Sequence, residues 1–291
     1  MTPPDKVLGT LLGSAVGDAL GMPIDGLSHQ NVRTYYKGVK AYRDDEYRRD
    51  LGAGQWTRHT QRLFALVRAL AGGSDNLANR YAEELTGLTL RRPADPATAT
   101  SDAAVLASAL SLAGDDRTSP LDRLADILGD EAGPVALAAA AGQVEAVRLL
   151  LAADPGTLDG PAFFHAVTDA AVRAETHLSA STAVSDRLRT LAGHLDAFPL
   201  DLQDLCAGTG PAADEAWPFA LAMLARNPAL LEATMLPGVN VGGAASAIGA
   251  LLGALLGALH GWSAFPEAWR AGLEDVGRLE AEARACAKSS V

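Results

Sequence analysis

The segment WTRHTQ, residues 56–61, places several side chains that can bind a ligand or transfer a proton next to one another. Arg58 carries a planar guanidinium whose N–H groups match the oxygens of a phosphate or a carboxylate. His59 carries an imidazole whose ordinary pKa of about 6.5 lets it exchange a proton near neutral pH. Trp56 can stack on an adenine or fill the core, and packing is the commoner role of a buried aromatic residue. The segment therefore suggests an anion-binding site.

A helix is expected to present these side chains. Gly52 and Gly54 favour a turn just before the segment, and Thr57 or Thr60 can cap a helix there. Apolar residues then follow with the spacing of a helix that buries one face, at Leu63, Phe64, Leu66, Val67 and Leu70. The segment from Leu27 to Leu51 is polar and irregular, and it is predicted to be a long surface loop of the kind that often borders a site.

Two glycine-rich stretches are predicted to form the centre of the protein. Leu236–Trp262 has no charged Asp, Glu, Lys or Arg, and it carries glycine at 249, 253, 257 and 261. Near the N-terminus, glycine recurs with the same spacing at 9, 13, 17 and 21. Residues four apart share one face of a helix, and a glycine face lets a second backbone approach closely. We expect these two helices to pack on each other.

A membrane span is the rival interpretation of Leu236–Trp262, because about 20 apolar residues can cross a bilayer. The stretch is rich in Gly and Ala rather than Leu, Ile and Val, and no Lys/Arg cluster flanks it. No membrane association is expected.

Composition favours an all-α protein. The chain of 291 residues is 48% hydrophobic with only 5% aromatic residues, and Ala and Leu dominate. No repeat unit recurs, and the breaks between helices have loop length, so residues 1–291 are predicted to form a single domain, an orthogonal helical bundle. Further helices are expected at 76–90, 100–113, 121–128, 134–152, 161–178, 183–195, 213–226, 228–235 and 266–287.

The net charge and the cysteine content limit which binding partners and which cellular compartment are expected. A formal net charge of -11 argues against nucleic-acid binding. Cys206 and Cys286 show neither metal-ligand spacing nor a disulfide framework. The N-terminal MTPPDKVLG lacks the pattern of a secretion signal, so a cytoplasmic location is expected. No protein partner is indicated by the sequence.

The order of glycines and polar residues at the two ends of the chain resembles a known family. Residues 9–25 follow the opening pattern GxxxGxAxGDAxGxPxE of the ADP-ribosylglycohydrolases, with Asp25 in place of the final Glu. Residues 240–261 are similar to the closing pattern NLGGDTDTxAAIxGAxxGAxxG and retain Asn240, Gly242 and Gly243. The resemblance implies the all-α bundle of these enzymes, which remove ADP-ribose from modified side chains.

The resemblance ends at the metal ligands. The family's TDDT and DTDT motifs supply four carboxylates and hydroxyls to two divalent cations, whereas this chain has Thr57-Arg58-His59-Thr60 and Ala244-Ala245-Ser246-Ala247. Mg²⁺ needs oxygen ligands, usually charged ones, and all four carboxylates are replaced. The two Mg ions of the family are therefore not expected, and no other cofactor is indicated.

The central loop is altered as well. The family's GNGAAMR loop, which contacts ADP-ribose, corresponds to Thr100–Leu106, with Ser101 and Asp102 at its start. By this resemblance, the residues expected around a ligand are Asp25, Trp56, Thr57, Arg58, His59, Ser101, Asp102, Asn240, Gly242, Gly243 and Ser246.

Three functions remain open at this point. The altered site can bind ADP-ribose or another phosphate-bearing ligand through Arg58 and the backbone N–H groups of Gly242 and Gly243, without catalysis. Alternatively, Arg58 pairs with Asp18 or Asp25, and the protein is a structural or partner-binding scaffold. In the third hypothesis a hydrolase works without metal, with Asp25 as acid or base and His59 as helper.

Overall fold

The computed structural model describes residues 4–73, 75–95, 97–113 and 119–289. Within these residues the chain forms fifteen α-helices and no strand, and an isolated bridge joins Ser28 to Gly242. The predicted all-α class is confirmed. That residues 1–291 form a single domain stays a prediction.

The α-helices are α1 (Pro4–Gly21), α2 (His29–Asn31), α3 (Arg58–Ala71), α4 (Leu77–Leu85), α5 (Asp102–Leu110), α6 (Pro120–Leu128), α7 (Pro134–Ala152), α8 (Gly160–Leu178), α9 (Ala183–Ala192), α10 (Pro199–Leu205), α11 (Ala213–Arg226), α12 (Leu231–Asn240), α13 (Ala245–His260), α14 (Glu267–Gly272) and α15 (Val276–Ser289). Short 3-10 turns lie at Met22–Ile24, Gly129–Glu131 and Trp262–Ala264, and a π-helical turn lies at Val32–Tyr36.

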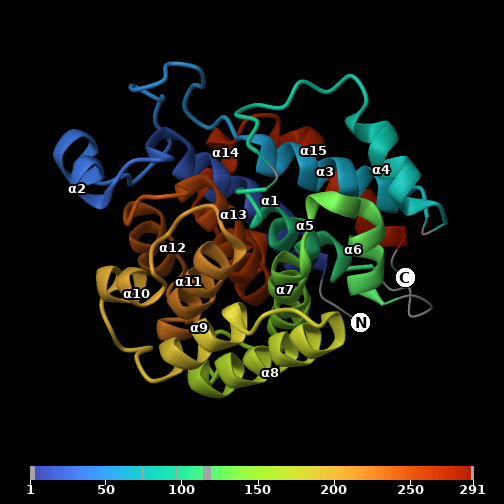
Figure 1. Cartoon of the computed structure of the whole chain (residues 1–291). Helices are drawn as coiled ribbons and strands as arrows, with labels where there is room; N and C mark the ends of the chain where they lie inside the picture. The colour runs from blue at the N-terminus through green and yellow to red at the C-terminus, as the bar shows by residue number, and fades with distance from the viewer. Residues whose placement is uncertain (1–3, 74, 96, 114–118, 290–291) are drawn as a thin grey trace.

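Helices α1 and α13 form the centre of the molecule, and the other long helices surround them (Figure 1). Their glycines face one another so closely that a Cβ atom built on Gly17 would lie 1.8 Å from the carbonyl oxygen of Gly249. A Cβ atom on Gly13 would lie 2.4 Å from the carbonyl oxygen of Gly253. The predicted contact between the two glycine helices is therefore confirmed, with backbone packed directly on backbone.

This packing places the ends of the two helices side by side. The C-terminus of α1 leads through the turn Met22–Ile24 to Asp25, and α13 begins at Ala245. A Cβ atom on Gly21 would lie 2.1 Å from the carbonyl oxygen of Ala245. The close approach therefore brings Asp25 to the start of α13, where the backbone N–H of Ser246 donates to its carboxylate over 3.1 Å.

Several predicted boundaries were wrong. The central helix starts at Ala245 because Gly242 and Gly243 adopt positive φ angles of 85° and 72° and break the chain after α12. The loop predicted for 27–51 contains α2 and the π-helical turn, and α10 was not predicted. The closing segment forms two helices, α14 and α15, rather than one.

Two described helices are long and apolar enough to pass for membrane spans, Pro4–Ile24 and Pro134–Ala152. In the first, the whole apolar window is buried inside the protein, and in the second 61% of it is buried. Their apolar character is therefore accounted for by helix packing in the core.

The thiols of Cys206 and Cys286 are buried in different parts of the fold. Burial raises the pKa of the Cys206 thiol to about 12 and that of the Cys286 thiol to about 11. Both side chains are thiols rather than reactive thiolates at neutral pH.

Candidate functional site

The N-terminus of α3 is fixed by a buried carboxylate from α1. Asp18 is fully buried and accepts hydrogen bonds from the backbone N–H groups and the hydroxyls of Thr57 and Thr60, at 2.7 to 3.1 Å. The backbone N–H of Arg58 donates to the carbonyl oxygen of Arg91. The N–H groups of the first turn therefore have partners within the protein, and the turn is held in one position.

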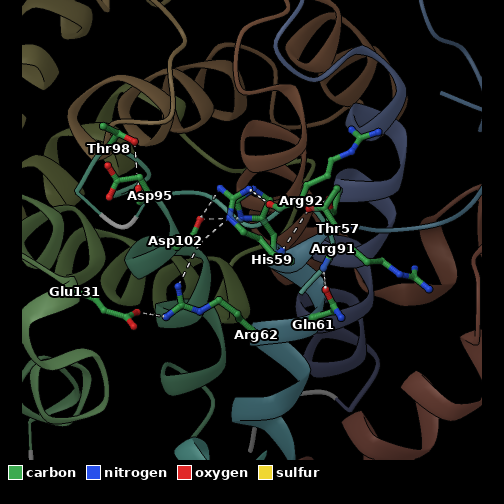
Figure 2. A network of polar contacts seen from close by, with 12 residues as sticks. Thr57, His59, Gln61, Arg62, Arg91, Arg92, Asp95, Thr98, Asp102 and Glu131 are labelled. Carbon is green, nitrogen blue, oxygen red and sulfur yellow. Dashed lines mark hydrogen bonds and ion pairs between the residues drawn. The ribbon is translucent and has the colours of Figure 1, made fainter. Parts of the chain in front are cut away.

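Arg58 and His59 extend from this turn to Asp102, the first residue of α5. Figure 2 shows His59 beside Asp102. Arg58 donates to the two carboxylate oxygens of Asp102 over 3.1 and 3.3 Å, through Nε and Nη2. Its Nη1 donates to the carbonyl oxygen of Arg92 over 3.0 Å. The Arg58 guanidinium is thus bound to the protein through all three nitrogens.

Asp102 is the centre of a buried charge cluster. Besides Arg58, it contacts Arg62 at 3.3 Å, and Nδ1 of His59 lies 3.0 Å from its Oδ1. Burial alone would raise the pKa of the Asp102 carboxyl, but His59, Arg58 and Arg62 together hold that pKa well below its usual range. Asp102 is therefore an ionised acceptor, and Arg62 continues the cluster outward to the half-exposed Glu131.

Next to this cluster lies a pocket of about 500 Å³ that opens to the surface. It is built from six separate stretches of chain. The lining residues are Asp25, Gly26, Arg48, Arg58, His59, Arg92, Pro93, Ala94, Gly210, Pro211, Gly243, Ala244 and Ser246. The start of α3 and the start of α13, which carry the two altered motifs, therefore meet at one pocket.

The three arginines of the pocket differ in how far they are neutralised. The side chain of Arg92 is 7% exposed, pairs with Asp45 and Asp50, and also donates to the carbonyl oxygen of Met22. The side chain of Arg48 is 39% exposed, and its nearest carboxylate oxygen, Oδ2 of Asp25, lies 3.7 Å from Nη1. That distance is too long for a hydrogen bond. Arg48 is therefore the pocket cation whose donors are least engaged.

A family model described as ADP-ribosylglycohydrolase matches residues 1–290 of this chain. The chain belongs to the ADP-ribosylglycohydrolase family. A solved structure titled "ADP-ribosylglycohydrolase-related protein complex" has a similar fold, with a TM-score of 0.75 and 24% identity, and the match covers 99% of each chain. An uncharacterized protein of Archaeoglobus fulgidus is 42% identical over 66 residues, which make up 23% of this chain and 21% of that protein.

Five of the residues predicted to surround a ligand in this ADP-ribosylglycohydrolase family member line the pocket: Asp25, Arg58, His59, Gly243 and Ser246. Asp102 lies behind them and contacts Arg58 and His59. The hydroxyl of Ser246 has no hydrogen-bond partner among the described residues.

The other predicted residues lie outside the pocket lining. Thr57 caps α3, Ser101 is fully buried, and Gly242 packs against Leu27. The amide of Asn240 bonds to both backbone groups of Val39, which ties α12 to the 37–57 segment. These positions hold the scaffold of the pocket together.

Trp56 is packed rather than presented to the pocket. It is 6% exposed, its indole N–H donates to the carbonyl oxygen of Glu274, and the Arg91 guanidinium lies 4.5 Å from the ring centroid. A ligand adenine has no access to a ring held in this way. Of the two predicted roles, packing is the one that the geometry supports.

The predicted partners of Arg58 were wrong. The scaffold hypothesis paired it with Asp18 or Asp25, but Arg58 pairs with Asp102. Asp18 is already saturated by two threonines, and Asp25 accepts from the backbone N–H of Ser246.

The backbone groups expected to hold an anion are also occupied. The N–H of Gly242 donates to Val239, and that of Gly243 donates to Leu27 over 2.8 Å. The next N–H, that of Ala244, donates to Thr209 over 2.6 Å. These three N–H groups are therefore not available to an anion in the pocket.

Arg48 and Arg92 were missed by the sequence analysis. Arg48 belongs to the charged run RDDEYRRD, whose loop was predicted to border a site, and Arg92 belongs to the Arg-Arg-Pro run at 91–93. Clustered arginines in polar loops were the available signal, but nothing in the sequence tells which of them point inward.

Proposed function

We propose that this ADP-ribosylglycohydrolase family member binds a phosphate-bearing small molecule, ADP-ribose or a related nucleotide, in the pocket without a pair of divalent metals. The single observation that carries the proposal is Arg48, a half-exposed cation at the pocket with no hydrogen-bonded carboxylate. A guanidinium in this state can accept a phosphate as its partner without first breaking a strong ion pair. Arg58 and Arg92 add positive potential, reduced by their own carboxylates.

The chemistry of the lining supports the absence of metal. Two Mg²⁺ ions need several carboxylate oxygens, whereas the pocket presents a single carboxylate, Asp25, with three arginines. Within the described residues no group of three or more His, Cys, Asp or Glu side chains is placed to hold a metal ion. The residues present do not fit the family's metal pair, so the metal-assisted hydrolysis of the family is not part of the proposed function.

The scaffold hypothesis stays as the second candidate because of Arg58. Its three hydrogen bonds to Asp102 and Arg92 suit a residue whose role is to fill and stabilise this part of the fold. In that case the pocket is a remnant, and the protein acts through its surface.

The two candidates differ in the outcome of a calorimetric titration with ADP-ribose. We expect binding of equal strength in EDTA and in excess Mg²⁺. Arg48→Ala should weaken it by roughly tenfold or more, because a hydrogen bond to a charged group contributes about 1.5–3 kcal/mol. The matched control is Arg49→Asn, which removes the same charge one residue away; asparagine tolerates the positive φ of 58° at this position.

If no heat of binding is measured in either buffer, the scaffold role is the candidate that remains. Binding that requires Mg²⁺ would show that metal ligands exist after all. Release of free ADP-ribose from a modified peptide in EDTA would favour the metal-independent hydrolase, with Asp25 as the group to replace.

A gain-of-metal variant tests the correspondence with the family motifs. Replacing Arg58, His59, Ala244 and Ser246 with aspartate restores carboxylates on both sides of the pocket. We expect calorimetry to detect Mg²⁺ binding in this fourfold variant and none in the wild type. A variant that keeps its helical circular dichroism but binds no Mg²⁺ would mean that the two motifs are not aligned as the family resemblance implies.

A further inference from the structure

The imidazole of His59 is held between the charge cluster and the pocket. Its side chain is 1% exposed, yet it contributes to the pocket lining. Nδ1 lies 3.0 Å from Oδ1 of Asp102, a close contact that is not linear enough to count as a hydrogen bond. The attraction between the two groups is therefore chiefly electrostatic, and it fixes which edge of the ring faces Asp102.

This contact decides which ring nitrogen carries the hydrogen in the neutral form. Asp102 is ionised and can only accept, so the nitrogen that faces it must be the N–H. The lone pair is then on Nε2, which has no hydrogen-bond partner among the described residues. Unlike Nδ1, Nε2 is not among the buried side-chain atoms without a partner, so it is open to the pocket and a ligand hydroxyl there can donate to it.

An acceptor in a pocket that also presents three arginines discriminates between ligands. A phosphate at neutral pH offers mostly acceptor oxygens, so it suits Arg48 but not Nε2 of His59. A sugar hydroxyl is a donor and suits Nε2. A site built to hydrogen-bond a hydroxyl rejects analogues that lack it, because its own polar group is then left unpaired.

We infer that His59, oriented by Asp102, accepts a hydrogen bond from a ligand hydroxyl, so that the pocket selects sugar phosphates over phosphates without a sugar. The inference rests on the proposed function, in which Arg48 binds the phosphate, and it names the class of ligand. Ser246 lies in the same lining, and its unpaired hydroxyl can donate to or accept from the same sugar.

The test compares two phosphate monoesters of equal charge, D-ribose 5-phosphate and methyl phosphate. Affinities are measured at pH 8, where free imidazole is neutral, by ³¹P NMR, which reaches millimolar dissociation constants. We expect wild-type protein to prefer ribose 5-phosphate. His59→Phe should weaken ribose 5-phosphate binding by about tenfold and leave methyl phosphate binding unchanged.

A second variant tests the positioning role of Asp102. In Asp102→Asn, the side-chain amide can donate to Nδ1, which moves the ring hydrogen to Nε2 and turns the pocket acceptor into a donor. Ribose 5-phosphate should then lose affinity while methyl phosphate keeps or gains it. A purely structural role of Asp102 would weaken both ligands together. Circular dichroism verifies that the variant is folded, and His59→Phe decides the question if it is not.

The results that would contradict the proposed function differ from those that would contradict the hydroxyl role of His59. If neither monoester nor ADP-ribose binds the wild type, the proposed function itself is wrong. If ADP-ribose binds but ribose 5-phosphate does not, or if His59→Phe weakens both monoesters equally or neither, the hydroxyl role of His59 is wrong and the phosphate site at Arg48 stands.

Discussion

Replacing Gly17 with alanine is expected to destabilise the protein by about 3 kcal/mol or more, which is the upper range for overpacking of a protein core. The added Cβ atom would lie 1.8 Å from the carbonyl oxygen of Gly249 and 2.3 Å from its carbonyl carbon. These are backbone atoms in the middle of a helix, so no side-chain rotation relieves the clash. Either α1 and α13 move apart along their length or the contact between them is lost.

The displacement would spread because the glycines act together. Gly257 lies equally close to the carbonyl oxygen of Gly9, at 1.8 Å from its own ideal Cβ position, so separating the helices at one point opens the packing along the whole interface. Urea denaturation followed by circular dichroism measures the change in the free energy of unfolding.

Gly277→Ala is the matched control for this prediction. Gly277 lies in α15, is exposed, and has no atom within 4 Å of its ideal Cβ position. Alanine there should be neutral or stabilise the protein by up to about 1 kcal/mol, since it is the better helix former. Equal effects of the two substitutions would show that α1 and α13 do not pack as closely as described.

The sequence was sufficient to predict this central contact because the signal is local and periodic. Four glycines at four-residue intervals in each of the two stretches predict a close helix–helix approach. For the same reason the predicted bounds of α7 and α11, Pro134–Ala152 and Ala213–Arg226, agree with the structure. In both helices, an apolar run gives way to polar residues at or just beyond the C-terminal end.

The pocket could be predicted only in part. Family motifs located Arg58, His59 and Ser246, because the motifs are read along the chain. Which carboxylate neutralises Arg58 depends on whether Asp18 is already saturated, and that follows from side chains 39 and 42 residues away. Such competition among buried groups is settled by packing and leaves no mark in the sequence pattern.

The break in the helix at Gly242 and Gly243 also could not be predicted from the sequence. Glycine in an apolar run is compatible with a helix, and Leu236–Trp262 is predicted to form one. In the structure both glycines have positive φ angles, and Cβ atoms there would lie 2.2 Å from the carbonyl oxygens of Leu27 and Thr209. Contacts with distant loops decide the conformation.

The second large effect is expected at Asp102. Asp102→Ala should destabilise the protein by about 3–5 kcal/mol, the usual result of removing one partner from a buried ion pair. Arg58 and Arg62 would be left with side chains only 9% and 11% exposed and without this carboxylate. Thermal and urea unfolding of the variant measure the loss.

Glu131→Ala is the informative control, because Glu131 also pairs with Arg62. Its side chain is 50% exposed, so water screens the pair and replaces it when it is lost. We expect a change of about 1 kcal/mol or less. If Glu131→Ala and Asp102→Ala have similar effects, burial is not what makes the Asp102 cluster important.

A compensating substitution separates lost attraction from an uncompensated charge. In the Asp102→Ala background, Arg58→Met removes one stranded cation and fills its volume with an apolar chain, so the double variant should regain part of the stability. In wild-type protein, Arg58→Met should instead destabilise. The opposite signs in the two backgrounds are the expected signature of a buried pair, and additivity of the two substitutions would contradict it.

The lowered pKa of the Asp102 carboxyl predicts how the stability of the protein depends on pH. Because the pKa of Asp102 is lower in the folded protein than in the unfolded chain, its contribution is fully present above the unfolded value of about 3.9. It is lost as the pH falls from there toward the folded pKa. The difference in unfolding free energy between wild type and Asp102→Ala should therefore be constant from pH 7 to about pH 5 and shrink below pH 4. A difference that already shrinks between pH 7 and 5 would contradict the lowered pKa of Asp102.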